Sequence, residues 1–135
     1  MSKKLAEGID GLVLDIKTGN GAFMRSNKES IALANSLIKT AKSFDKNVIA
    51  FITDMNQPLG NYVGNWLEVY ESILVLQNKV KNDLYILSVK LAGAMIYLGK
   101  KAKSIQEGEN IARQQIQNGK AFNKFLEIGD NIILN

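Results

Sequence analysis

The sequence contains no cysteine and no histidine, and it has a single proline among its 135 residues. Without cysteine the chain forms no disulfide and offers no thiolate to a metal. Without histidine it supplies no imidazole as a general base or as a metal ligand. No apolar run approaches the roughly 20 residues that a membrane-spanning helix requires. These absences exclude a disulfide-stabilised scaffold, a metal centre built on thiolate or imidazole, and a transmembrane anchor within this sequence.

The start of the chain and its charge bear on location and partners. Met1-Ser2-Lys3-Lys4 is not followed by an apolar signal core, so we read the chain as cytoplasmic, with no membrane partner. The net charge is +4, and lysines crowd the middle and the tail of the chain. A basic surface could serve nucleic acid. No aromatic residues interleave with these lysines, so we favour solvated helix faces and expect no nucleic-acid partner.

Two short apolar runs predict the strands of a sheet. They are Gly11–Lys17 and Val48–Thr53, and the first is apolar nearly throughout, which favours burial on both faces. Between them, Ser26 and Glu29 form a capping box that opens a helix. A strand, a helix and a strand of these lengths predict a parallel βαβ unit with a right-handed crossover.

After the second strand the sequence is helical throughout. Asn65 with Glu68, Asn82 with Asp83, and Ser104 with Glu107 predict three helix starts, and a last short helix covers 121–128 and ends at Gly129. The fold class is therefore α/β, a parallel βαβ unit followed by a helical segment. Apolar spacing predicts the inward-facing side chains, which are Ile31, Ala34, Leu37, Ile38, Ala41, Leu67, Tyr70, Ile73, Leu74, Leu84, Leu87, Leu91, Met95 and Leu98.

Four runs occur in a specific order: SKKLAEGIDGLVLDIK, GNGAFM, ITDMNQPLG and VGNWLEVYES. Together they resemble the pyrimidine nucleoside phosphorylase family, which includes thymidine phosphorylase. The resemblance is densest from Ser2 to Glu71 and continues through the helical tail. It implies an internal segment of the nucleoside phosphorylase/phosphoribosyltransferase catalytic domain. On this view residues 1–8 are a remnant of the small α domain, and residues 9–135 are part of the α/β catalytic domain.

The resemblance implies an activity that this chain supports only in part. Family members transfer the pentosyl group of thymidine, uridine or deoxyuridine to phosphate, giving free base and a pentose 1-phosphate. The family's phosphate loop and pyrimidine-binding arginine precede this segment, so we expect no catalytic residue here and no activity from the chain alone. The alternative is a non-catalytic binding or interaction module derived from the phosphorylase.

Two residues carry the implied base pocket. In the family, the lysine that opens the KKLAEG run contacts a ring carbonyl of the pyrimidine, and here it is Lys3. A fixed cation there stabilises the negative charge on the departing base. Phe23, in the loop between Gly19 and Met24, would line the same pocket. From the residues alone, Lys3 could instead offset a helix dipole, and the loop could be only a tight turn.

The third implied site is a potassium site, and potassium is the only cofactor expected. Carried over by position, its ligands are the backbone carbonyls of Leu59 and Tyr62 and the side chain of Glu71. Oxygen donors suit such a cation. Trp66 departs from the small residue that the family prefers there. The alternative for Glu71 is a solvated glutamate on a helix surface.

Two further expectations concern Asp15, Asp54 and assembly. We interpret both aspartates as loop anchors, because phosphorolysis depends more on phosphate and a cationic pocket than on a pair of carboxylates. The family is homodimeric through its small α domain. Strand edges left uncovered invite pairing, so we expect this chain to self-associate or to require a complementing chain.

Overall fold

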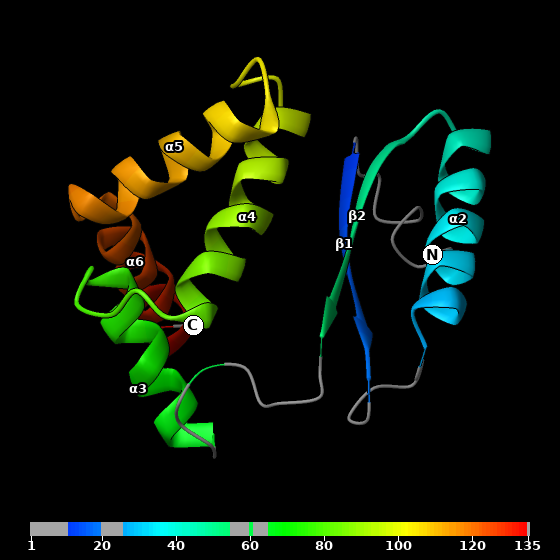
Figure 1. The fold of residues 1–135 in the computed structure, drawn as a ribbon. Helices are drawn as coiled ribbons and strands as arrows, with labels where there is room; N and C mark the ends of the chain where they lie inside the picture. The colour runs from blue at the N-terminus through cyan, green and yellow to red at the C-terminus, as the bar shows by residue number, and fades with distance from the viewer. Residues whose placement is uncertain (1–10, 20–25, 55–59, 61–64, 135) are drawn as a thin grey trace.

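The computed structural model describes residues 11–19, 26–54, 60 and 65–134, which form two strands and five helices. The expected residues Lys3, Phe23, Leu59 and Tyr62 lie outside these ranges, as does the expected division at residue 8. The elements, in chain order (Figure 1), are β1 (Gly11–Thr18), α2 (Asn27–Ser43), β2 (Asn47–Asp54), α3 (Asn65–Leu76), α4 (Asp83–Leu98), α5 (Ile105–Gln117) and α6 (Lys120–Leu134).

The two strands pair in parallel, which confirms the predicted βαβ unit. Their register runs from Gly11 opposite Asn47 to Thr18 opposite Asp54. Helix α2 makes the crossover and lies on one side of the sheet, while α4 and the other helices lie on the opposite side (Figure 1). The α/β fold class read from the sequence is therefore confirmed.

The predicted burial of the first strand on both faces is confirmed only in part, since no residue of β1 is exposed but most are half-buried. Within β1 only Ile16 and Thr18 are buried, and in β2 the side chain of Ile52 is 38% exposed. In the described part of the chain each strand pairs only with the other. Within the described residues both strands are therefore sheet edges, and each lacks a second neighbouring strand along its open side.

Helix α2 begins where the capping box predicts. The Ser26 hydroxyl accepts a hydrogen bond from the backbone N–H of Glu29 at 3.2 Å. The helix buries Ser30, Ala34 and Ala41, whereas the predicted inward residue Ile31 is 49% exposed. Ser30, Ala34 and Ala41 have small side chains, so this side of the helix can lie close to the sheet. Ile31 lies next to this buried side and is partly exposed to solvent.

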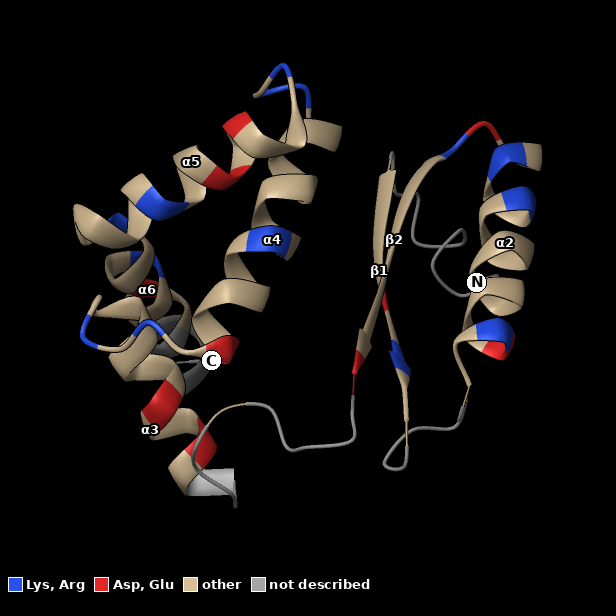
Figure 2. Ribbon diagram, viewed as in Figure 1, with Lys and Arg blue, Asp and Glu red and all other residues tan. Residues whose placement is uncertain are grey.

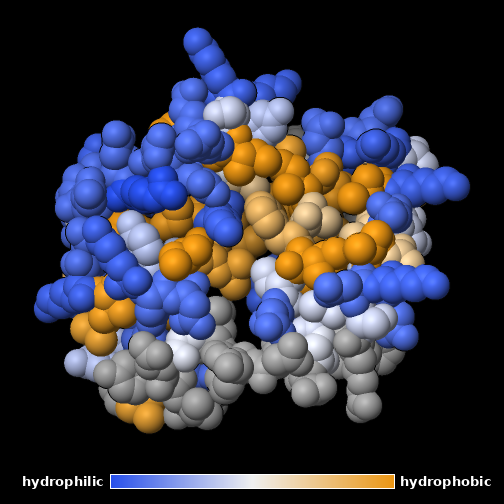
Figure 3. All heavy atoms as spheres, in the orientation of Figure 1, coloured by the Kyte–Doolittle hydropathy of each residue, from blue (hydrophilic) through white to orange (hydrophobic). Residues whose placement is uncertain are grey.

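The core of the helical part is formed by α3, α4 and α5. Val75, Tyr85, Val89, Ala112 and Ile116 are buried together. Several side chains predicted to point inward are exposed instead, namely Leu67 (45%), Tyr70 (48%) and Met95 (57%). The sides of these helices that are buried therefore differ from the sides that the apolar spacing predicts. Figure 3 shows hydrophobic side chains gathered in the middle of the face in view, over α4 and the strands, with hydrophilic side chains around them.

Helices α4 and α5 cross through two glycines. A Cβ atom added at Gly93 would lie 2.6 Å from the backbone nitrogen of Glu109, and one added at Gly108 would lie 3.0 Å from the carbonyl carbon of Gly93. Real Cβ atoms essentially never approach backbone this closely. The two helix backbones are therefore in contact, and any side chain at either glycine would separate them.

We expect Gly108→Ala to lower the free energy of unfolding by about 1–3 kcal/mol, because the added methyl overpacks the helix crossing. Helix propensity alone predicts the opposite sign, a gain of roughly 0.8–1 kcal/mol for alanine over glycine. Urea denaturation measures the difference. The matched control is Gln106→Ala on the exposed side of α5, which should not destabilise the chain. A stabilised Gly108→Ala variant would contradict the close crossing.

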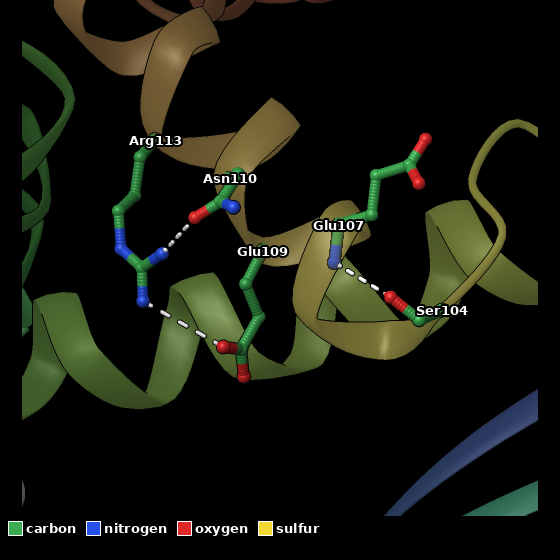
Figure 4. A network of polar contacts seen from close by, with 5 residues as sticks. All are labelled: Ser104, Glu107, Glu109, Asn110 and Arg113. Carbon is green, nitrogen blue, oxygen red and sulfur yellow. Dashed lines mark hydrogen bonds and ion pairs between the residues drawn. The ribbon is translucent and has the colours of Figure 1, made fainter.

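Helix α5 begins with the third predicted capping box. The Ser104 hydroxyl accepts from the backbone N–H of Glu107 at 3.0 Å (Figure 4). On the same helix, Arg113 donates to the Asn110 side chain at 2.7 Å and pairs with Glu109 at 3.6 Å. The contact with Asn110 is exposed and the pair with Glu109 is partly exposed, so both contribute little. The cap satisfies a backbone donor that has no partner inside the helix.

Ser104→Ala should therefore cost about 1 kcal/mol of stability, as removal of an N-cap typically does. Ser104→Asp keeps an acceptor at the same place and should be close to neutral, and Ser104→Gly should cost only a few tenths of a kcal/mol. Thermal unfolding of the three variants separates these outcomes. Equal losses in all three would show that the hydroxyl does not act as a cap.

The predicted end of the last helix is wrong. Helix α6 continues through Gly129 to Leu134 instead of ending at Gly129. Glycine lowers helix propensity by about 1 kcal/mol without ending a helix by itself. The positive φ that a glycine terminator uses occurs before this helix, at Gly119 (φ 80°).

Candidate functional site

The carboxyl ends of the two strands carry polar side chains. Asp15 Oδ1 accepts a hydrogen bond from the Thr53 hydroxyl at 2.5 Å, and Asp15 Oδ2 pairs with Lys17 Nζ at 2.5 Å. Asp15 and Lys17 are two residues apart, so their side chains lie on the same face of β1. Thr53 is the register partner of Lys17. Asp15 therefore ties the ends of β1 and β2 together, in keeping with its interpretation as an anchor.

The loop after β1 begins with a glycine that the backbone requires. Gly19 is buried and has a φ of 110°, a conformation that side chains disfavour. This agrees with the tight turn read from the glycines of the GNGAFM run. Phe23, predicted to line a base pocket at the end of this loop, lies outside the described residues. Ligands of open parallel sheets sit at this end of the strands.

The second polar site lies where α3 meets α4, and its centre is Glu71. The side chain of Glu71 is 2% exposed, although it carries a carboxylate. The side-chain amide of Asn82 donates to Glu71 Oε2 at 2.6 Å. The alternative of a solvated surface glutamate is therefore wrong. A carboxylate this well buried must be compensated by hydrogen bonds or by a positive charge.

Gly60 lies directly against this carboxylate. Its φ is 79°, and an added Cβ atom would lie 2.8 Å from Glu71 Cδ and 2.9 Å from Glu71 Oε2. The Gly60 N–H donates to both carboxylate oxygens of Asp83, at 3.0 and 3.1 Å. The carboxylate of Glu71 thus fills the space that a side chain at Gly60 would occupy.

The potassium site that the resemblance implies stays a prediction. Of its expected ligands, Glu71 supplies a carboxylate that lies against Gly60. Gly60 stands in the sequence between the other two, Leu59 and Tyr62. Those two residues lie outside the described part of the chain. Within that part, no cluster of three or more Asp or Glu side chains is placed to hold a metal. Glu71 is thus the expected donor whose position the structure gives.

The structure adds two residues that sequence reasoning did not assign to this site. Asn82 and Asp83 were read only as the start of a helix, which is confirmed, since Asn82 Oδ1 accepts from the Tyr85 N–H at 3.1 Å. Both side chains also reach the site, Asn82 at Glu71 and Asp83 at Gly60. The sequence showed two adjacent polar residues at a helix start. It could not show their partners, because Glu71 lies in another helix and Gly60 in a loop.

The basic residues do not form one surface on a single element. Figure 2 shows Lys and Arg spread over α2, α4, α5 and the connecting loops. An open cavity of 490 Å³ at the amino ends of the strands is lined by Lys42, Lys46 and Lys100. Lys42 lies in the last turn of α2 and Lys100 follows α4, so both offset helix C-terminal dipoles.

Across the described ranges, no helix is long and apolar enough to cross a membrane.

A family model described as "Glycosyl transferase family, a/b domain" matches residues 1–122. The chain belongs to this family. The match includes both strands, the crossover helix, and the Glu71 site, so the described geometry is that of a glycosyl transferase α/β domain. The family resemblance read from the four sequence runs is thereby confirmed.

Relatives of the chain within the glycosyl transferase family have specific names. The chain is 40% identical over 131 residues to the pyrimidine-nucleoside phosphorylase of Staphylococcus haemolyticus, which is 97% of this chain and 30% of that protein. It is 42% identical over 125 residues to the Staphylococcus epidermidis protein of that name and 41% identical to the Staphylococcus aureus one. Each alignment covers 93% of this chain and 29% of the relative. The chain therefore corresponds to under a third of these phosphorylases.

Proposed function

We propose that this chain is a segment of a pyrimidine nucleoside phosphorylase that supplies part of the base pocket and the Glu71 side of a cation site. The observation that carries the proposal is 40% identity across nearly the whole chain to the Staphylococcus haemolyticus phosphorylase. The complete enzyme would transfer the pentosyl group of a pyrimidine nucleoside to phosphate. Its products are free base and a pentose 1-phosphate.

Within such an enzyme the residues of this chain bind and orient. Lys3 would face the pyrimidine carbonyl and Phe23 would pack against the ring, as the resemblance implies. Leu59, Tyr62 and Glu71 would hold potassium. The ion, when bound, would place a positive charge beside the buried carboxylate of Glu71. Positioning and electrostatic stabilisation carry most of the work in a reaction of this kind.

A chimera tests the proposal directly. The 131 aligned residues of the Staphylococcus haemolyticus phosphorylase are replaced by those of this chain, and release of thymine and uracil from their nucleosides is followed in phosphate buffer. We expect the chimera to release base and the isolated chain to release none. A chimera that folds but releases no base, with native enzyme as the positive control, would overturn the proposal. Base release by the isolated chain would overturn the partial role.

A second candidate is a non-catalytic interaction module of the same origin. The observation in its favour is that α3, α4 and α5 bury a core of their own. Cooperative unfolding of a clean monomer would support that candidate. Under the first proposal, the edges of β1 and β2, which carry no further strand in the described residues, should lead to self-association or need a complementing chain. Light scattering distinguishes the two. The cytoplasmic location and the absence of a nucleic-acid partner stay predictions.

A further inference from the structure

We propose that Asn82 is a positioning residue that holds the carboxylate of Glu71 against Gly60, in the orientation that a potassium ion would use. The inference rests on the proposed function, because the identity of the ion comes from it. Asn82 touches neither a substrate nor, on this proposal, the ion, and it acts through Glu71.

The first argument is that both ends of the Asn82 side chain are engaged. Its carbonyl oxygen accepts from the Tyr85 N–H at 3.1 Å, and its amide nitrogen donates to Glu71 Oε2 at 2.6 Å. The first bond fixes the side chain at the start of α4. The second therefore comes from a donor that cannot rotate away. Serine and aspartate also cap helices well, but neither carries the amide donor.

The second argument is that the neighbouring residue holds the opposite wall. Asp83 accepts from the Gly60 N–H with both carboxylate oxygens. Asn82 and Asp83 are consecutive, so the first turn of α4 fixes the Glu71 carboxylate and Gly60 relative to each other. Helix α4 is itself anchored in the core through Tyr85 and Val89. The distance between Glu71 and Gly60 is thus set by a rigid element.

The third argument concerns charge. A lysine or arginine at position 82 would neutralise Glu71 and compete with a cation. The amide of Asn82 orients the carboxylate and adds no positive charge of its own. Second partners of this kind keep a ligand in place, and their loss typically lowers metal affinity by about 10–100-fold. Asn82 fits this role by chemistry as well as by distance.

The test measures potassium binding by the full 135-residue chain, so it does not depend on enzymatic activity. KCl is titrated at constant ionic strength against tetramethylammonium chloride, and the ¹H–¹⁵N signal of the Gly60 amide reports binding. Asn82→Ser and Asn82→Asp keep a capping oxygen for α4 but remove the amide donor. We expect both to weaken potassium binding by about 10–100-fold. Of the two variants, Asn82→Asp should hold the Glu71 carboxylate less well, because its own carboxylate repels that of Glu71.

The control is Ser104→Ala, which removes a helix cap far from Glu71 in the sequence. It should lower the melting temperature and leave potassium affinity unchanged, so a merely structural effect is recognised. Unchanged potassium affinity in both Asn82 variants would overturn the proposal. A Gly60 amide signal that does not shift with KCl in the unaltered chain would also overturn it. If either of these results is found while the chimera releases base, the phosphorylase proposal holds and only the positioning role of Asn82 fails. If the chimera is inactive while the Asn82 variants lose potassium, only the positioning role stands.

Discussion

Replacing Gly60 with alanine is expected to lower the free energy of unfolding by about 2–5 kcal/mol. Two costs combine. At a φ of 79° the new side chain pays the left-handed backbone penalty, about 1–2 kcal/mol. The same Cβ atom would fall 2.8 Å from Glu71 Cδ, which adds an overpacking cost of about 1–3 kcal/mol. Denaturant unfolding of the variant and of the unaltered chain measures the sum.

Gly119 provides a matched control for the backbone term. Its φ is 80°, and no atom lies within 4 Å of the place where its Cβ would be. Gly119→Ala should therefore cost only the backbone penalty, about 1–2 kcal/mol. In a Glu71→Ala background, Gly60→Ala should cost about as much as Gly119→Ala, because the crowding atom is gone. Equal losses for Gly60→Ala and Gly119→Ala in the unaltered chain would refute the contact between Glu71 and Gly60.

The second large effect is expected in the chimera with the Staphylococcus haemolyticus phosphorylase. There Lys3→Ala should lower kcat/KM by about 2–4 kcal/mol of transition-state stabilisation. The physical reason is that phosphorolysis leaves negative charge on the departing base, and a fixed cation beside the ring carbonyl stabilises it. Because the charge grows as the bond breaks, kcat should fall more than KM rises.

Lys4 supplies the control for Lys3. It is adjacent and carries the same charge, and the resemblance gives it no contact with the base. Lys4→Ala should leave kcat/KM close to that of the chimera. If Lys3→Ala and Lys4→Ala reduce kcat/KM equally, the effect is one of general charge, and Lys3 has no place at the pyrimidine. An unchanged rate in Lys3→Ala removes it from the site altogether.

Local signals in the sequence determined the elements. Side chains that bond to backbone three residues away act within a few residues, so the caps at Ser26, Asn82 and Ser104 lie where the sequence predicts them. The parallel pairing of β1 and β2 was also predicted from the order of elements, because two strands joined by a crossover helix form a βαβ unit and run in the same direction. Family membership also came from the sequence, through long runs in a fixed order.

Only the tertiary structure decided which side of each helix is buried and what surrounds Glu71. Apolar spacing favoured Leu67 and Tyr70 in α3, yet the helix buries Glu71 and Val75. A buried carboxylate cannot be read from a hydrophobic pattern, since its burial depends on donors from elsewhere in the chain. Here Asn82 supplies the donor, and Gly60 leaves the room. These contacts form between residues 11 or more positions apart, so packing fixes them and local sequence does not.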